Sequence, residues 1–123
     1  MQGYERSSIL SVLLLTMGCS SWVAAQPVRG NPQAGQAVYE KNCLHCHGEK
    51  LDGAGPEGQY VIVRPTNLQS ITSRAKTDWE LLITIPHGAA FTPMHGFRGK
   101  LTDQQMMDVL AYVRMMAQFD PLS

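Results

Sequence analysis

The segment Cys43-Leu44-His45-Cys46-His47 constrains this chain more than any other feature, because it spaces two thiols and an imidazole as C-x-x-C-H. This pattern is typical of the covalent attachment of c-type haem. Two thiols separated by two residues can each add to one of two neighbouring vinyl groups, and the histidine that follows can ligate the iron from one side of the ring. We therefore predict that Cys43 and Cys46 bind haem c and that His47 is an iron ligand.

Other uses of two closely spaced cysteines fit the sequence less well. A zinc site would need a second pair of ligands, yet no cysteine follows Cys46. A thioredoxin-like redox pair would need a strand–helix–strand context, which this chain does not offer. A plain disulfide stays open as an alternative, although it gives no role to His47. A single C-x-x-C-H motif predicts a single haem.

The N-terminus carries a short apolar run over residues 9–17. This run is too short for a permanent membrane span, which needs roughly 20 residues. The basic residue Arg6 precedes it and small residues ending at Ala25 follow it, which is the layout of a secretory signal peptide. We expect residues 1–25 to be removed and residues 26–123 to form one exported domain in the periplasm.

A second processing route stays open for the same segment. Gly18-Cys19 resembles the end of a bacterial lipobox, in which the cysteine is lipidated. Thr16, however, stands where that motif prefers a branched apolar residue. We therefore expect membrane attachment only if Cys19 is lipidated, and a diffusible protein otherwise.

Length and charge exclude several classes of protein. A chain of 123 residues has room for one domain. Ten Lys and Arg residues balance ten Asp and Glu residues, so no basic footprint suggests nucleic acid as a partner. The sequence contains no nucleophile–base pair, carboxylate dyad or phosphate-binding loop. We therefore expect that the protein is not an enzyme.

Helix start signals predict an all-α fold. An Asn-Pro pair starts the first helix, because Asn is a good cap and Pro suits the first helical position. The capping boxes Thr-Asp-Trp-Glu and Thr-Asp-Gln-Gln start two more. A proline ends the second helix. The expected helices cover residues 31–41, 77–86 and 102–118.

Two of these helices carry faces that predict how they pack. Gly35 and Tyr39 lie four residues apart, on one face of the first helix. Because glycine in an exposed helix only costs stability, Gly35 indicates a close helix crossing. The last helix carries an apolar stripe made of Met106, Leu110, Val113 and Ala117, with Val109 and Tyr112 beside it.

Between the helices the sequence predicts mostly irregular chain. Residues 47–59 are rich in glycine and are expected to form a loop. Residues 60–63 have no partner strand, so we expect them to be an extended segment against the haem edge. In the middle helix we assign Trp79 to the core.

Together these features resemble the class I cytochrome c family, in its small bacterial form with one haem, over about residues 30–119. In that family an N-terminal helix with a Gly-x-x-x-aromatic face crosses the C-terminal helix, and Gly35 and Tyr39 match that face. The segment Leu-Ala-Tyr-Val at residues 110–113 is similar to the facing surface. The resemblance implies a cytochrome c fold, with crossed N- and C-terminal helices and a third helix and loops wrapped around one covalent haem.

The resemblance also implies further site residues. Pro65 opens a Pro-Thr-Asn-Leu segment that looks like the family's Pro-x-x-Leu, whose proline packs beside the proximal histidine. Met94, in Thr-Pro-Met, occupies the position of the family's distal iron ligand. Many relatives carry proline at the next position, where this chain has His95, so His95 stays open as the distal ligand. Arg64 is a candidate partner for a haem propionate.

The implied function is one-electron transfer. With His47 and Met94 as ligands, the iron has no open site for a substrate, and a carrier of this kind docks transiently on redox partner proteins. Two alternatives stay open. The chain could be a small haem c subunit of a membrane oxidase or a periplasmic dehydrogenase, or it could be a ligand-binding haem sensor or enzyme with a labile distal ligand.

Overall fold

The regular elements of the chain are helices. The computed structural model describes residues 29–121, and over this range two isolated β-bridges are the only strand-like pairings. The expected all-α fold is therefore confirmed, whereas the predicted signal peptide (1–25), with Cys19, lies outside the described residues. In chain order the elements are α1 (Pro32–Asn42), α2 (Leu44–His47), the 3-10 helix η1 (Gly58–Tyr60), α3 (Ile71–Arg74), α4 (Asp78–His87) and α5 (Asp103–Met116).

The start of α1 is fixed by its cap. The Asn31 side chain accepts hydrogen bonds from the backbone N–H groups of Gln33 and Ala34, at 2.9 and 3.3 Å. These bonds satisfy two of the N–H groups that a helix start leaves without a partner. The Asn31 N–H itself donates to the carboxylate of Asp108 on α5, at 2.7 Å. The cap therefore also ties α1 to α5.

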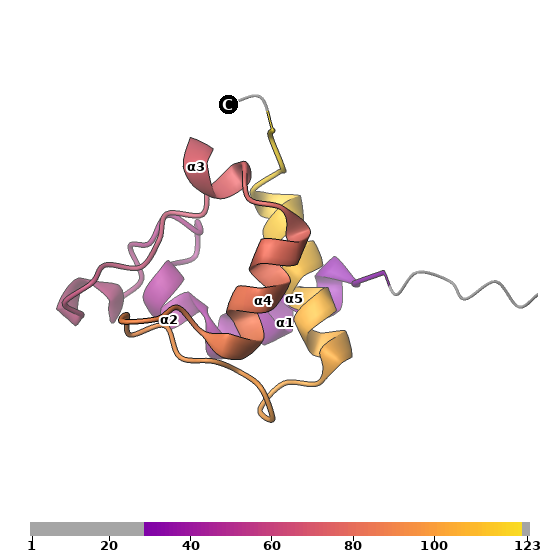
Figure 1. Cartoon of the computed structure of the whole chain (residues 1–123), viewed down its shortest axis with the longest axis horizontal. Helices are drawn as coiled ribbons and strands as arrows, with labels where there is room; N and C mark the ends of the chain where they lie inside the picture. Colours follow the sequence, from indigo (N-terminus) through magenta and orange to yellow (C-terminus); the bar gives the residue numbers. More distant parts are fainter. Residues whose placement is uncertain (1–28, 122–123) are drawn as a thin grey trace, which may run out of the picture.

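The crossing of α1 and α5 is the centre of the fold, and Figure 1 shows α5 passing in front of α1. A Cβ placed on Gly35 would lie 1.9 Å from the carbonyl oxygen of Asp108, so the two backbones approach more closely than a side chain allows. One turn further on, the rings of Tyr39 and Tyr112 pack with centroids 5.3 Å apart. The predicted close crossing is confirmed. The core around it consists of Tyr39, Leu51, Val109, Tyr112 and Ala117.

α4 begins at its predicted capping box. The Glu80 N–H donates to the Thr77 hydroxyl at 3.3 Å, and the Thr77 N–H donates to the Glu80 carboxylate at 2.7 Å. The helix continues one residue past Pro86 to His87, and Gly88 forms its C-cap. The expected end at Pro86 was therefore one residue short, because the proline lies within the last helical turn.

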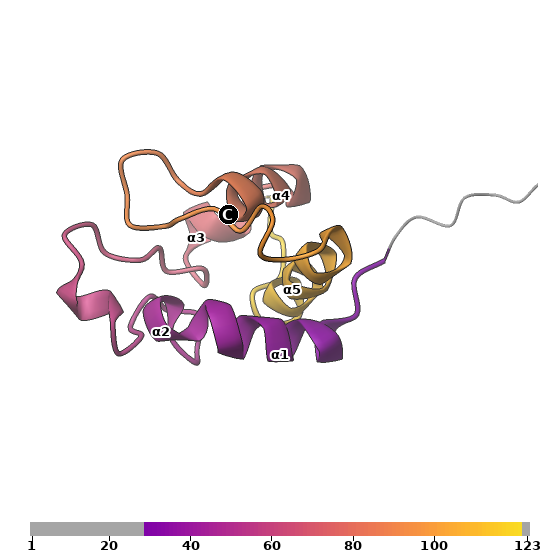
Figure 2. The same ribbon diagram turned by 90° about the horizontal axis from the view of Figure 1, so that it is seen from below.

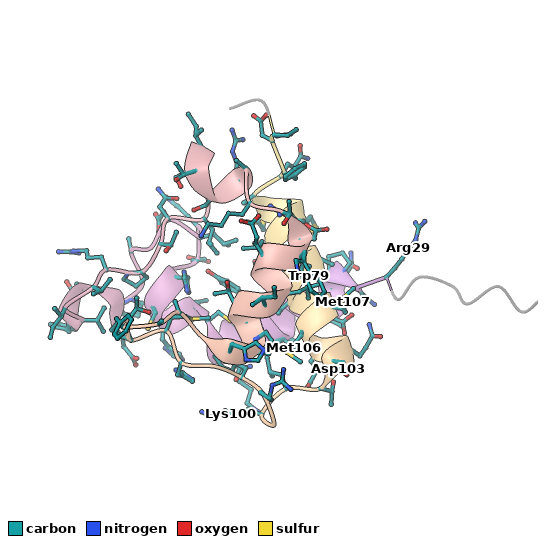
Figure 3. All side chains as sticks on the ribbon, viewed as in Figure 1. Arg29, Trp79, Lys100, Asp103, Met106 and Met107 are labelled. Atoms are coloured by element: carbon teal, nitrogen blue, oxygen red, sulfur yellow. The ribbon has the colours of Figure 1, made fainter. Side chains whose placement is uncertain are left out.

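Trp79 is the clearest difference from expectation. It was assigned to the core, but its side chain is 71% exposed, and Ile83, four residues later on the same face of α4, is 44% exposed. Figure 3 shows Trp79 on α4, where that helix runs alongside α5. The assignment was wrong because α4 carries apolar residues on more than one face, and a helix packs only part of its circumference against one neighbour.

The molecule has two layers, as Figure 2 shows: α1 and α2 lie in one, and α4 with the loop between α4 and α5 lies in the other. The chain between α2 and α3 starts in the first layer and includes residues 60–63. The extended segment that was expected is confirmed only at Val61, whose backbone is extended with φ −90° and ψ 145°. Tyr60 ends η1 and residues 61–63 form a bend, with the Ile62 side chain fully exposed.

Candidate haem site

The C-x-x-C-H segment forms a single helical turn directly after α1. Cys43 caps this turn, and its carbonyl oxygen accepts from the N–H groups of Cys46 and His47, at 3.2 and 2.9 Å. Residues three apart in a helical turn share one face, so the two thiols can reach one edge of a single ligand. Both cysteines are half-buried, and no disulfide joins them.

The loop after α2 folds back onto this turn and satisfies its carbonyl groups. A helix end leaves its last carbonyl oxygens without partners, and here three loop N–H groups supply them. Gly53 donates to His47 (2.9 Å), Gly55 to Cys46 (3.1 Å) and Glu57 to His45 (2.8 Å). The glycine-rich segment, which the sequence predicted only as an irregular loop, therefore holds the attachment turn in place.

The ring of His47 is oriented by a backbone carbonyl. Its Nδ1 lies 3.3 Å from the carbonyl oxygen of Thr66. In the tautomer that donates this bond, Nε2 keeps its lone pair and can ligate iron. Burial lowers the pKa of His47, against a smaller opposite effect of the bond to Thr66. At neutral pH the ring is therefore in the neutral form that a metal requires.

Pro65 brings this carbonyl to the attachment turn. A Cβ placed on Gly53 would lie 2.5 Å from the Pro65 carbonyl oxygen, and one on Gly58 would lie 3.0 Å from its Cγ. The predicted Pro65 thus packs against the loop that follows His47. Thr66 was not among the predicted site residues, because a backbone carbonyl leaves no trace in residue type. Arg64 is exposed in the chain that leads into Pro65.

Two alternative uses of the cysteines find no support in this geometry. Burial, with a smaller contribution from the neighbouring Cys46, raises the pKa of the Cys43 thiol to about 12. A redox-active Cys-x-x-Cys pair requires the opposite, a thiol with a lowered pKa. Between residues 29 and 121, no group of three His, Cys, Asp or Glu side chains is arranged to hold a metal ion, so a zinc site is not supported either.

Met94 lies in the loop between α4 and α5, on the other side of the molecule. Its side chain is half-buried. The Ala89 N–H donates to the Met94 carbonyl oxygen at 3.0 Å, and the Met94 N–H donates to the Thr92 hydroxyl at 3.2 Å. Figure 2 shows that this loop belongs to the layer opposite α2. His47 and Met94 therefore come from opposite layers.

His95, the alternative distal ligand, and His87, a further histidine at the end of α4, both contact neighbours in or next to the same loop. The ring of His95 packs on that of Phe97, with centroids 4.6 Å apart. Nε2 of His87 lies 3.0 Å from the guanidinium of Arg98. Of these candidate ligands in or next to the loop, Met94 is the one with a soft thioether sulfur.

These residues fit a covalent haem. The donor set offers two thiols on one helical face and an imidazole whose Nδ1 is already oriented. α4 is rich in apolar residues, yet none of them is fully buried, and Ile85 is only partly buried where it packs against the core. Large apolar side chains on the loops are also exposed, Tyr60 at 82% and Phe91 at 103%. A porphyrin supplies apolar surface that side chains of this kind can cover.

Comparison with known proteins gives the family. The family described as cytochrome C oxidase, cbb3-type, subunit III, matches residues 30–113. The chain belongs to the class I c-type cytochromes. Cytochrome c6 of Synechocystis sp. is 30% identical over 79 residues, which cover 64% of this cytochrome and 60% of that relative. The family carries covalently bound haem c with its iron, and this is the cofactor of the chain.

A solved structure agrees with the fold. A chain of the Kuenenia stuttgartiensis reducing HAO-like protein complex is similar, with a TM-score of 0.61 and 26% sequence identity over 73% of this cytochrome. The similar region is 44% of that chain, so the present cytochrome spans about half the length of the proteins it matches. No helix between residues 29 and 121 is long and apolar enough to cross a membrane.

Proposed function

We propose that this cytochrome is a one-electron carrier of the periplasm and not an enzyme. In this role Cys43 and Cys46 would hold the haem through thioether bonds, and His47 and Met94 would ligate its iron. The bound haem supplies an iron that changes its oxidation state by one electron. With both of these ligands in place, the iron would have no open position for a substrate.

One observation carries this proposal. Half-buried His47 and half-buried Met94 come from the two opposite layers of the molecule, as two axial ligands of one ring must. The Thr66 carbonyl supports the role of His47, because it leaves Nε2 as the ligating nitrogen. His87 contacts Arg98 and His95 packs on Phe97. These contacts occupy both imidazoles, which supports Met94 as the distal ligand.

Two further residues complete the proposed site. Pro65 packs on the loop after α2 and positions the carbonyl that orients His47. Arg64 precedes it with an exposed guanidinium, and we assign it to a haem propionate, a pairing in which Arg can donate two hydrogen bonds. Residues 1–25 would direct export and be cleaved off, which leaves residues 26–123 in the periplasm, where the carrier meets its redox partners in transient complexes.

A second function is favoured by the comparisons. The matched family is described as a subunit of a cbb3-type oxidase, and the similar structure belongs to a protein complex. This cytochrome could likewise be the haem c subunit of such a complex, with a permanent partner. Fractionation of the native cells separates the two functions. A diffusible carrier starts at Gln26 and is found in the periplasmic extract at its own molecular mass, whereas a subunit stays with the membranes or with a larger periplasmic complex, and a lipoprotein at Cys19 stays with the membranes.

A potentiometric titration of the purified holoprotein tests the carrier function. We expect reversible reduction with the slope of a single electron, and no binding of carbon monoxide by the ferrous protein. Reversible one-electron behaviour together with a closed iron is what a carrier requires. Carbon monoxide binding by the unmodified protein would contradict the proposal and favour a ligand-binding sensor or enzyme.

A further inference from the structure

The distal loop presents two side chains that can ligate iron, Met94 and His95, at adjacent positions. The segment that contains them is fastened to the end of α4 along its length. His95 forms an antiparallel bridge with Gly88. The Phe97 N–H donates to the Ile85 carbonyl at 3.0 Å, and the next N–H along the chain donates to the Pro86 carbonyl at 3.1 Å. The backbone of this segment therefore has a fixed position.

Close packing at Gly96 fixes the segment further. A Cβ placed on Gly96 would lie 2.4 Å from the carbonyl oxygen of Pro86, so the backbone between His95 and Phe97 lies directly against the helix end. A segment held this closely cannot twist about its own axis without losing its hydrogen bonds to α4. The backbone thus favours one set of side-chain directions, and the packing of the side chains decides whether the segment keeps them.

Those directions separate the two candidate ligands. Neighbouring side chains of an extended segment alternate between two faces. His95 and Phe97 share one face, since their rings pack with centroids 4.6 Å apart at an interplanar angle of 42°. Met94 therefore belongs to the other face.

Phe97 can hold the His95 imidazole in place because it is itself buried. Its side chain is 4% exposed and belongs to the buried hydrophobic residues, whereas His95 is exposed. In the part of the chain that the structure describes, Phe97 is the side chain against which the His95 ring packs. The partner that keeps this ring in place is thus itself buried.

We propose that Phe97 is a positioning residue that holds the His95 imidazole away from the iron and so leaves the distal position to Met94. This inference rests on the ligation proposed above. Its consequence is chemical, because an imidazole and a thioether in this position give different reduction potentials. A residue that never touches the iron would then decide which ligand the chain offers.

A competition experiment in a Met94→Ala background tests this role. Removing the thioether opens the iron, so added imidazole should bind to the ferric holoprotein and shift its absorption spectrum. Adding Phe97→Leu should release His95 to compete, and we expect the apparent dissociation constant for imidazole to rise about three- to tenfold, the size of one aromatic-pair interaction. A third substitution, His95→Ala, should restore the original value.

The variants separate positioning from loss of structure. Leucine keeps an apolar side chain in the core, and Phe91→Leu is a matched control, since Phe91 lies in the same loop but is fully exposed and should change nothing. An unchanged dissociation constant with Phe97→Leu would overturn the inference. So would a weakened affinity that persists after His95→Ala, or a Met94→Ala protein already closed by His95. If Met94→Ala leaves the iron spectrum of the parent unaltered, the proposed ligation fails, and this inference fails with it.

Discussion

Gly35 illustrates what a single residue decides in this molecule. Helix propensity alone favours alanine over glycine within a helix by about 1 kcal/mol. The crossing demands the opposite, since a Cβ at this position would lie 1.9 Å from the Asp108 carbonyl oxygen and 3.0 Å from the Cβ of Tyr112. The contact is with backbone on one side, so no side-chain rotation can relieve it.

We therefore predict that Gly35→Ala destabilises the holoprotein. The helices must move apart, and overpacking of this kind costs about 1–3 kcal/mol. Chemical denaturation followed by circular dichroism measures the loss. Ala37→Gly, at an exposed position of the same helix, calibrates propensity and should cost about 1 kcal/mol. A stabilised Gly35→Ala protein would contradict the close crossing.

At the scale of an element, the two capping boxes differ in charge. In α4 the Thr77 N–H and hydroxyl donate to the Glu80 carboxylate at 2.7 and 2.8 Å, and these bonds lower the pKa of Glu80. In α5 the partner of Thr102 is the uncharged Gln105, whose side chain accepts from the Thr102 N–H at 2.9 Å. Only the first box can respond to pH.

The prediction follows from the sign of that shift. A carboxylate with a lowered pKa in the folded state stabilises the fold above the ordinary glutamate pKa of about 4.3, and this contribution is lost as the pH falls through the folded-state value. Glu80→Gln should therefore lower the melting temperature at neutral pH, and the difference should shrink in acid. Gln105→Ala should cause a loss that does not depend on pH in this way. A constant Glu80→Gln effect over the whole range would rule out the charged cap.

The sequence predicts elements well where the signal is local. Asn31, Thr77 and Thr102 mark the three main helix starts because a cap and the helix it starts are neighbours in the chain. α3 was not predicted, since four residues carry too little periodicity to be recognised. The exposure of Trp79 depends on which face of α4 meets α5, and no pattern within α4 determines that.

The same distinction between local signals and long-range contacts applies to the candidate site. The attachment motif is contiguous, so its turn could be predicted from five residues. The Thr66 carbonyl near His47 and the packing of His95 on Phe97 depend on how distant segments meet. A backbone carbonyl looks the same at every residue, and a ring contact outside a regular element has no characteristic spacing.

At the scale of the whole molecule, the protein core is small. A domain of about 100 residues is marginal on its own core, and apart from the crossing, Leu51 and Phe97 little apolar surface is fully buried in the described residues. α4 has no fully buried residue. We therefore expect the covalent haem to complete the interior of the molecule.

This leads to a prediction about the haem-free chain. The double variant Cys43→Ala/Cys46→Ala, expressed with its export signal, should be colourless and should lose most of its helix content in far-ultraviolet circular dichroism. The Met94→Ala protein keeps both thioether bonds, so it serves as the control and should stay helical. Native helix content in the colourless protein would show that α1, α4 and α5 assemble without the cofactor.

The axial ligand pair is the central claim, and the ferric absorption spectrum tests it most directly. Methionine ligation gives a weak far-red band from charge transfer between sulfur and iron. We predict that the band is present in the parent protein and absent in Met94→Ala, which should also bind carbon monoxide once reduced. A parent spectrum without this band, combined with changed ligation in His95→Ala, would contradict the account and assign the distal position to His95.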